Sequence, residues 1–143
     1  LQHHLPTFAT LFVGIIDLSS ATLTYCSAGH PPAILVSAQS GDAELLDVQS
    51  GVVGAFHDMK YKDGTVRLHT DDILLLYTDG TTEARNPEGS FFGETGLRDM
   101  VMDEVPRGFD GLLNRFLTTL DRYTGQRLED DVAMVALRFD ELG

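Results

Sequence analysis

The sequence predicts an α+β domain in which helices pack on the outside of a system of antiparallel sheets. Short stretches of β-type composition follow one another through the first half of the chain, and two stretches with apolar residues at helical spacing follow in the second half. The chain has 143 residues, of which 43% are hydrophobic. This length suits one domain with one hydrophobic core and is short for two. We therefore expect a single domain over residues 1–143.

The first half is predicted to be a series of antiparallel strands separated by turns. Residues 8–17 are rich in β-branched and aromatic side chains, and the partly alternating residues 21–27 return after a tight turn, which predicts a hairpin. An Ala-Gly-His-Pro-Pro sequence then breaks the pattern at 28–32. Two further strands are expected at 33–37 and 44–48, on either side of a turn at 39–42.

The middle of the chain leads into its most apolar strand. A glycine-rich loop is expected at 51–54, and residues 61–69 are predicted to form two short extended pieces around Asp63-Gly64. Residues 70–72 then turn into Ile73–Tyr77. This uninterrupted apolar run is typical of a strand that is buried on both faces.

The second half is predicted to contain a loop, two helices and a closing strand. Residues 81–93 are polar and too long for a simple hairpin connection, so this loop is a candidate for function. The first helix is expected at 95–105, where a proline ends it. The second is expected to begin at an Asp110 N-cap and to stop at Gly125. A final strand, residues 132–137, is expected to be buried.

Charge and cysteine content limit the classes of function. The formal net charge is −12 and only 10 residues are lysine or arginine, which argues against a nucleic-acid partner because those residues bind phosphate backbones. An acidic chain can instead collect cations. The single Cys26 cannot form an internal disulfide, so we expect a reducing compartment, the cytoplasm. No apolar run approaches the ~20 residues of a membrane-spanning helix, and no secretory leader is visible.

Two groups of carboxylates stand at the ends of apolar strands. Asp79 follows the strand Ile73–Tyr77 closely, and Glu129-Asp130-Asp131 precede the last strand. If the two strands are antiparallel neighbours, these side chains meet at one rigid edge, where hard oxygen ligands suit a divalent cation. Taken alone, an Asp before a Gly is also a common turn pair, and an acidic triplet is also a common solvated turn.

Four motifs occur in order along almost the whole chain. They are AGHPP at 28–32, DILLLYTDGTTEARN at 72–86, FG at 92–93 and DDVAM at 130–134. Together they resemble the bacterial PPM-type (protein phosphatase 2C-like) serine/threonine phosphatases of the stage II sporulation protein E family. The resemblance implies an αββα sandwich, a binuclear Mn²⁺ or Mg²⁺ centre between the sheets, and hydrolysis of phosphoserine or phosphothreonine on a partner protein. In many relatives of this kind the partner is an anti-sigma-factor antagonist.

The resemblance also implies roles for individual residues. Asp79 and Asp130 carry over as metal ligands, and Gly80 as part of the metal site, where a side chain would crowd metal-bound waters. Asp131 is expected to orient the loop or a metal-bound water, as neighbours of metal ligands do. Arg85 is a candidate for contact with the substrate phosphate, and a salt bridge that anchors its loop is an equal alternative.

One signature of the family is missing from the chain. The family carries an earlier Asp followed by a Gly-His-Gly or Gly-Asn-Gly turn, whose Asp bridges both metals, whereas His30 is followed here by Pro31. A turn residue with a hydrogen-bonding ring is the simpler interpretation of His30, ahead of acid–base catalysis. We therefore expect the C-terminal portion of a phosphatase domain, with the missing motif and a sensor domain upstream. The alternative is a non-catalytic phosphatase-like module that binds a partner without hydrolysing it.

Overall fold

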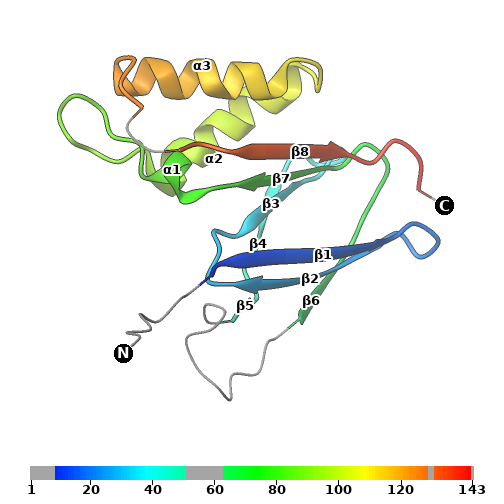
Figure 1. Ribbon diagram of the computed structural model, residues 1–143. Coiled ribbons are helices and arrows are strands. Elements are labelled where there is room, and N and C mark those ends of the chain that lie inside the picture. Colours follow the sequence, from blue (N-terminus) through cyan, green and yellow to red (C-terminus); the bar gives the residue numbers. More distant parts are fainter. Residues whose placement is uncertain (1–8, 51–62, 129–130, 143) are drawn as a thin grey trace, which may run out of the picture.

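The fold is a sandwich of two sheets with helices over one of them. The computed structural model describes residues 9–50, 63–128 and 131–142. In this part of the chain two four-stranded sheets lie face to face, and the two longer helices lie over the outer face of one sheet (Figure 1). The predicted α+β class is confirmed, and the helices described here cover one sheet only. The glycine-rich loop expected at 51–54 lies outside the described residues.

The first sheet is built around a hairpin. Its strands are β1 (Leu11–Asp17), β2 (Thr22–Ala28), β5 (Gln49–Ser50) and β6 (Asp63–Arg67). β1 and β2 are antiparallel, with Leu11 opposite Ala28, as the sequence predicts. β6 pairs antiparallel with the other edge of β2, and the short β5 extends that edge in the parallel sense. In the hairpin turn, the Asp17 carboxylate accepts hydrogen bonds from the backbone N–H groups of Ser19 and Ser20.

The pair Asp63-Gly64 is not a turn, contrary to the prediction. Both residues lie in β6, which pairs with β2 so that Gly64 is opposite Tyr25. A Cβ atom at Gly64 would lie 2.5 Å from the Tyr25 ring, which itself stacks on Phe12 at 5.7 Å. The glycine therefore makes room for a ring from the neighbouring strand, a requirement that the local sequence does not reveal.

The second sheet carries the most apolar strand at an inner position. Its order is β4 (Ala43–Leu46), β3 (Ala33–Val36), β7 (Ile73–Tyr77) and β8 (Met134–Arg138), with every neighbouring pair antiparallel. In β7, Leu75 and Tyr77 pack toward the helices, and Leu74 packs toward the first sheet. The prediction of a strand buried on both faces is confirmed.

The last strand was expected to be buried, and that expectation is wrong. β8 is an edge strand, and on the face it shares with Leu74 and Leu76 the side chains of Val135 and Leu137 are 50% and 39% exposed. Only alternate residues, such as Met134, pack against the core under the helices. The reason is that β8 ends its sheet, so among the described residues it has a neighbouring strand on one side only.

The helices begin and end close to the predicted positions. They are α1 (Asp79–Thr82), α2 (Gly93–Glu104), a 3₁₀ turn η1 (Val105–Arg107) and α3 (Leu112–Thr124). The N-cap of α3 is Gly111 rather than Asp110, and its φ of 76° is one that glycine adopts without strain. Gly125 ends α3 in the left-handed conformation, as predicted.

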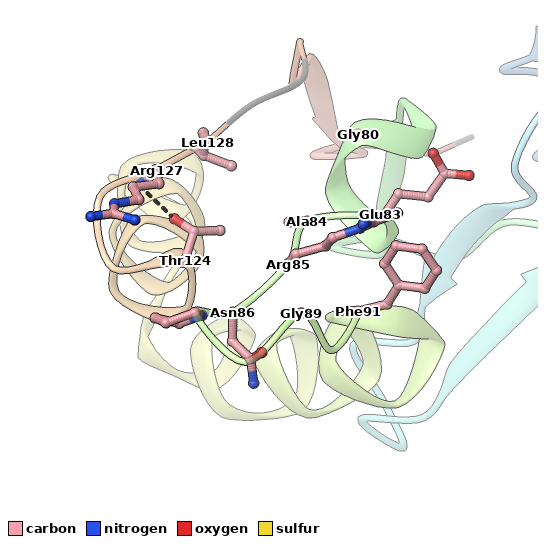
Figure 2. Close-up of a pocket in the computed structure, with 11 residues that line it drawn as sticks. Gly80, Glu83, Ala84, Arg85, Asn86, Gly89, Phe91, Thr124, Arg127 and Leu128 are labelled. Atoms are coloured by element: carbon pink, nitrogen blue, oxygen red, sulfur yellow. Dashed lines mark hydrogen bonds between the residues drawn. The ribbon is translucent and has the colours of Figure 1, made fainter.

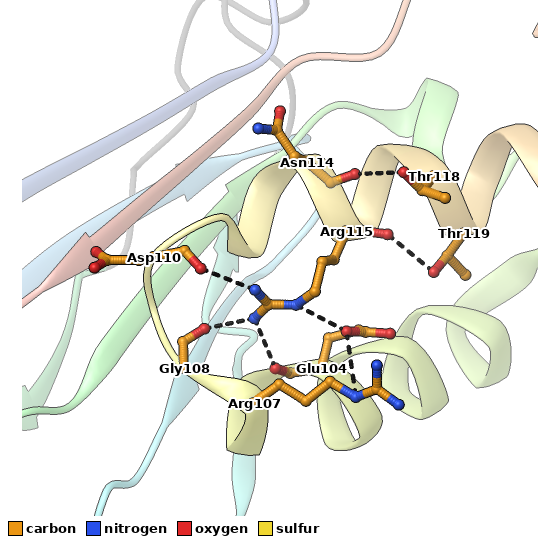
Figure 3. A network of polar contacts seen from close by, with 8 residues as sticks. All are labelled: Glu104, Arg107, Gly108, Asp110, Asn114, Arg115, Thr118 and Thr119. Atoms are coloured by element: carbon orange, nitrogen blue, oxygen red, sulfur yellow. Dashed lines mark hydrogen bonds and ion pairs between the residues drawn. The ribbon is translucent and has the colours of Figure 1, made fainter.

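Arg115 fastens the connection between α2 and α3 (Figure 3). Its Nε donates to the Glu104 carboxylate at 2.9 Å, and its Nη atoms donate to the backbone carbonyls of Glu104, Gly108 and Asp110. The guanidinium therefore satisfies carbonyl groups that the helix end and the loop leave unpaired. This network joins the end of α2 to the start of α3.

Candidate active site

The predicted site lies where β7 ends and α1 begins. Thr78 has an extended backbone (φ −91°, ψ 161°) and is the N-cap of α1, so Asp79 is the first residue of that helix. Asp79 is exposed, whereas Gly80 and Thr81 behind it are buried. The rigid strand thus ends in a carboxylate that is open to solvent at the rim of the core.

The start of β8 lies beside this strand end, as the sequence predicts. Tyr77 is opposite Met134, and the Thr78 N–H donates to the Ala133 carbonyl at 3.0 Å. The Thr78 hydroxyl also accepts from the Ala133 N–H at 3.0 Å and donates to the Asp131 carbonyl at 3.3 Å. One side chain therefore ties the acidic segment before β8 to the residue next to Asp79.

Thr78 is the residue of this arrangement that sequence reasoning missed. Its signal was its position directly before Asp79, at the end of an apolar strand, but its two partners become visible only once β8 is placed beside β7. Asp131 is exposed and belongs to the segment that Thr78 holds. Asp130 lies outside the described residues, so its approach to Asp79 stays a prediction.

The turn that contains His30 lies at the same end of the sandwich. Because Ile34 is opposite Leu75, the start of β3 lies near the end of β7, and residues 28–32 lead directly into β3. The His30 carbonyl accepts from the Ser27 hydroxyl at 3.3 Å and from Gln49 Nε2 at 3.1 Å. Its ring Nδ1 is 3.4 Å from the Thr10 hydroxyl. These contacts link β2, β5 and the start of β1, which favours the turn interpretation.

The segment after Asp79 is more ordered than the long polar loop expected there. The first two residues of that expected loop belong to α1 and its last residue begins α2. Between them, Arg85 and Phe91 form an isolated antiparallel β-bridge. The Tyr123 hydroxyl of α3 donates to the carbonyls of Ser90 and Phe91, both at 3.1 Å. The loop is therefore fixed to α3 and its shape is set before any ligand arrives.

Arg85 is held by an aromatic ring. Its guanidinium carbon lies 4.8 Å from the centre of the Phe91 ring, within the range of a cation–π contact. Among the described residues, no carboxylate lies within ion-pair distance of Arg85, so the alternative of a loop-anchoring salt bridge is not found there. The in-plane N–H donors of the guanidinium are not used by a salt bridge to any described residue.

Tyr77 lies near the site in sequence but cannot act as a base. It is buried under α2, and burial together with the nearby Glu94 carboxylate raises the pKa of its phenol to about 12. The phenol therefore stays neutral across the physiological pH range.

Two carboxylates near these strand ends are of the type that a hard divalent cation requires. Asp79 comes directly after Thr78 at the end of β7 and Asp131 lies three residues before β8, and carboxylate oxygens are ligands that Mg²⁺ and Mn²⁺ prefer. Within the described residues, however, no three His, Cys, Asp or Glu side chains come together to hold a metal ion. The described part of the chain thus fits a metal by donor type and supplies only part of a ligand set.

The helices carry no sign of a membrane segment. Over the described residues, none combines the length and the hydropathy needed to cross a lipid bilayer.

The model of one protein family, described as stage II sporulation protein E, matches residues 1–140 of the chain. Protein IcfG of Synechocystis sp. is 30% identical over 134 residues, which cover 91% of this chain and 20% of IcfG. Phosphoserine phosphatase RsbU of Bacillus subtilis is 26% identical over 131 residues, which cover 92% of this chain and 39% of RsbU. The chain therefore spans less than half the length of these two curated relatives.

A solved structure gives the same fold. The phosphatase domain of the cell fate determinant SpoIIE from Bacillus subtilis, presoaked with Mn, superposes with a TM-score of 0.72 at 16% sequence identity. The match covers 94% of this chain and 58% of that one. At this identity the likeness extends to the fold, and the remaining 42% of that chain (100 − 58) has no counterpart here.

Proposed function

The chain belongs to the stage II sporulation protein E family, and from this premise we propose that it is part of a metal-dependent phosphatase that hydrolyses phosphoserine or phosphothreonine on a regulatory partner protein. The observation that carries the proposal is the joining of the two strand ends through Thr78, which places the segment before β8 next to Asp79. The substrate proposed is a phosphorylated protein of the anti-sigma-factor antagonist type, acted on in bacterial signalling in the cytoplasm.

Asp79, the backbone of Gly80 and Asp130 are the groups proposed to hold Mn²⁺ or Mg²⁺. Two such ions, when bound, acidify a water molecule and offset charge on the attacking and leaving oxygens of the phosphoryl group. Asp79 supplies negative charge at the end of a strand that is buried on both faces, and Thr78 donates a hydrogen bond to the acidic segment. Asp131 is proposed to orient its neighbours, and His30 to shape the turn at the same end of the sandwich.

We propose that the chain is the C-terminal portion of a larger αββα domain, and exposed apolar side chains support this. On the outer face of the first sheet, Leu11, Val13 and Ile15 are 47%, 46% and 68% exposed. On β8, Val135 and Leu137 are exposed on the face that looks toward the first sheet. A second helix layer and further strands from the full polypeptide that carries this chain, called the parent protein below, would cover both groups of side chains. A sensor domain is proposed upstream.

A non-catalytic binding module is the second candidate. The observation in its favour is that the described residues hold no group of three metal-ligating side chains. The two candidates differ in one measurable property, the release of phosphate.

The test is phosphate release from a phosphoserine protein by the parent protein at saturating Mn²⁺. Asp79→Asn should lower turnover by at least about 100-fold, because Asn keeps the shape and removes the negative charge that offsets cation dehydration. The melting temperature without metal should hold or rise, since one of several neighbouring carboxylates is removed. Asp99→Asn, an exposed residue of α2, is the matched control and should retain wild-type turnover.

Two results would overturn the assignment. Wild-type turnover by Asp79→Asn would remove Asp79 from the mechanism, and a collapsed melting transition would mean that its role is structural. A wild-type parent protein that binds the phosphoprotein and releases no phosphate would favour the binding module.

A further inference from the structure

A polar cavity of about 730 Å³ lies between α1, the loop that follows it and the end of α3 (Figure 2). Gly80 and Glu83 line it on the α1 side, and Thr124 and Arg127 line it at the end of α3. The loop that contains Arg85 forms the wall between them. Gly80 is the residue after Asp79, so the cavity begins one residue away from the candidate metal site.

The charge of the cavity differs from that of the chain. The chain has a formal net charge of −12 and only 10 lysines and arginines. Two of them, Arg85 and Arg127, line this one cavity, and Glu83 is the only carboxylate among the described residues that line it. An anionic ligand that the rest of the surface repels is therefore attracted here.

Arg85 is set up to receive an anion. Its guanidinium lies over the Phe91 ring, and it forms no ion pair with a described carboxylate. A guanidinium that stacks by its face keeps its in-plane N–H donors, which match the oxygens of a phosphate in a two-pronged contact. The order of the loop supports the same conclusion, because a fixed donor loses little freedom when it binds.

The loop that contains Arg85 is held by hydrogen bonds within the loop and from α3. Asn86 accepts from the Ser90 N–H through its side chain at 2.8 Å, and its carbonyl accepts from the Gly89 N–H at 2.9 Å. Tyr123 holds the same segment from α3. The segment after Arg85 is thus a tight turn with hydrogen bonds inside it and to α3.

We propose that this cavity binds the polypeptide segment that carries the phosphoserine, with Arg85 on the phosphate and Arg127 at the rim on acidic side chains of the same segment. The proposal rests on the proposed function and adds the place where the substrate is recognised. The volume is that of a site for a few residues rather than for a folded domain. A nucleotide is the alternative occupant that the test below separates from a peptide.

The test measures binding separately from hydrolysis. A fluorescein-labelled peptide with a central phosphoserine flanked by glutamates is titrated with the parent protein in EDTA, where no metal is present, and anisotropy gives Kd. Arg85→Gln should raise Kd for the phosphopeptide about tenfold and have little effect on the unphosphorylated peptide. Arg127→Gln should raise Kd about threefold for both peptides, because it contacts carboxylates at an exposed rim. Arg122→Gln, an exposed residue of α3 outside the cavity, is the matched control.

Each outcome decides something. Wild-type Kd in Arg85→Gln, or no binding of the phosphopeptide by the wild type, overturns the cavity assignment even if phosphate release with Mn²⁺ is observed. An Arg85-dependent Kd without phosphate release keeps the cavity and overturns hydrolysis. Displacement of the phosphopeptide by ATP at micromolar concentration would mean that the cavity is a nucleotide site, and would overturn the assignment to a polypeptide. Thermal melts of all variants exclude unfolding as the cause.

Discussion

Replacing Thr78 with valine removes the hydroxyl that joins β7 to the start of β8 and keeps the shape of the side chain. Two hydrogen bonds are lost, one from the Ala133 N–H at 3.0 Å and one to the Asp131 carbonyl at 3.3 Å. The site is open enough for water to replace part of each bond, so each contributes about 0.5–1 kcal/mol. The free energy of unfolding should therefore fall by about 1–2 kcal/mol. The backbone bond from the Thr78 N–H to Ala133 remains, so the strand pairing should persist.

Two assays follow this change. Urea unfolding of the parent protein measures stability, and calorimetric titration measures Mn²⁺ affinity, which should weaken about tenfold because the acidic segment is no longer held. Thr78→Ser keeps the hydroxyl and should restore most of both properties.

The same stability and the same Mn²⁺ affinity in Thr78→Val and Thr78→Ser would contradict this prediction. Equal values would mean that the hydroxyl does not hold the acidic segment in solution. A loss of stability in Thr78→Val with unchanged Mn²⁺ affinity would mean that the Thr78 hydroxyl joins the two strand ends but does not affect metal binding.

Two further predictions concern the scaffold. Arg115→Met should lower the free energy of unfolding by about 2 kcal/mol, because it removes a charged hydrogen bond and three contacts to carbonyl oxygens. Urea unfolding measures this, with Arg122→Met as the control. Equal free energies of unfolding for the two variants would contradict the prediction. Hydrogen bonds from Ser19 and Ser20 lower the pKa of Asp17 below 3.8, so its stabilisation is present above that value and is lost as pH falls through the lower folded-state pKa. Asp17→Asn should flatten the fall of melting temperature below about pH 4, and parallel curves for wild type and variant would speak against it.

Features set by local composition could be predicted from the sequence. The apolar run Ile73–Tyr77 is buried on both faces, and the hairpin of β1 and β2 follows from two β-rich stretches around a short turn. Gly125 ends α3 because the left-handed conformation there favours glycine. Each of these depends on residues within a few positions of one another.

Features set by distant partners could not be predicted. Gly64 resembles a turn glycine until the Tyr25 ring is placed against it. β8 has the composition of a buried strand, and its exposure depends on what lies across from it in the other sheet. The same distinction applies to the site. The position of Asp79 followed from the strand before it. The hydrogen bonds of the Thr78 hydroxyl and the contribution of Arg127 to the cavity depend on pairing and packing between separate elements.

A crystal structure of the parent protein soaked with Mn²⁺ would show whether the end of β7 and the start of β8 form a metal centre. We expect anomalous peaks for Mn²⁺ within ~2–2.5 Å of carboxylate oxygens of Asp79 and Asp130. Carboxylates of these two residues more than ~8 Å apart would contradict it, because one or two cations with bonds of that length could not then link them.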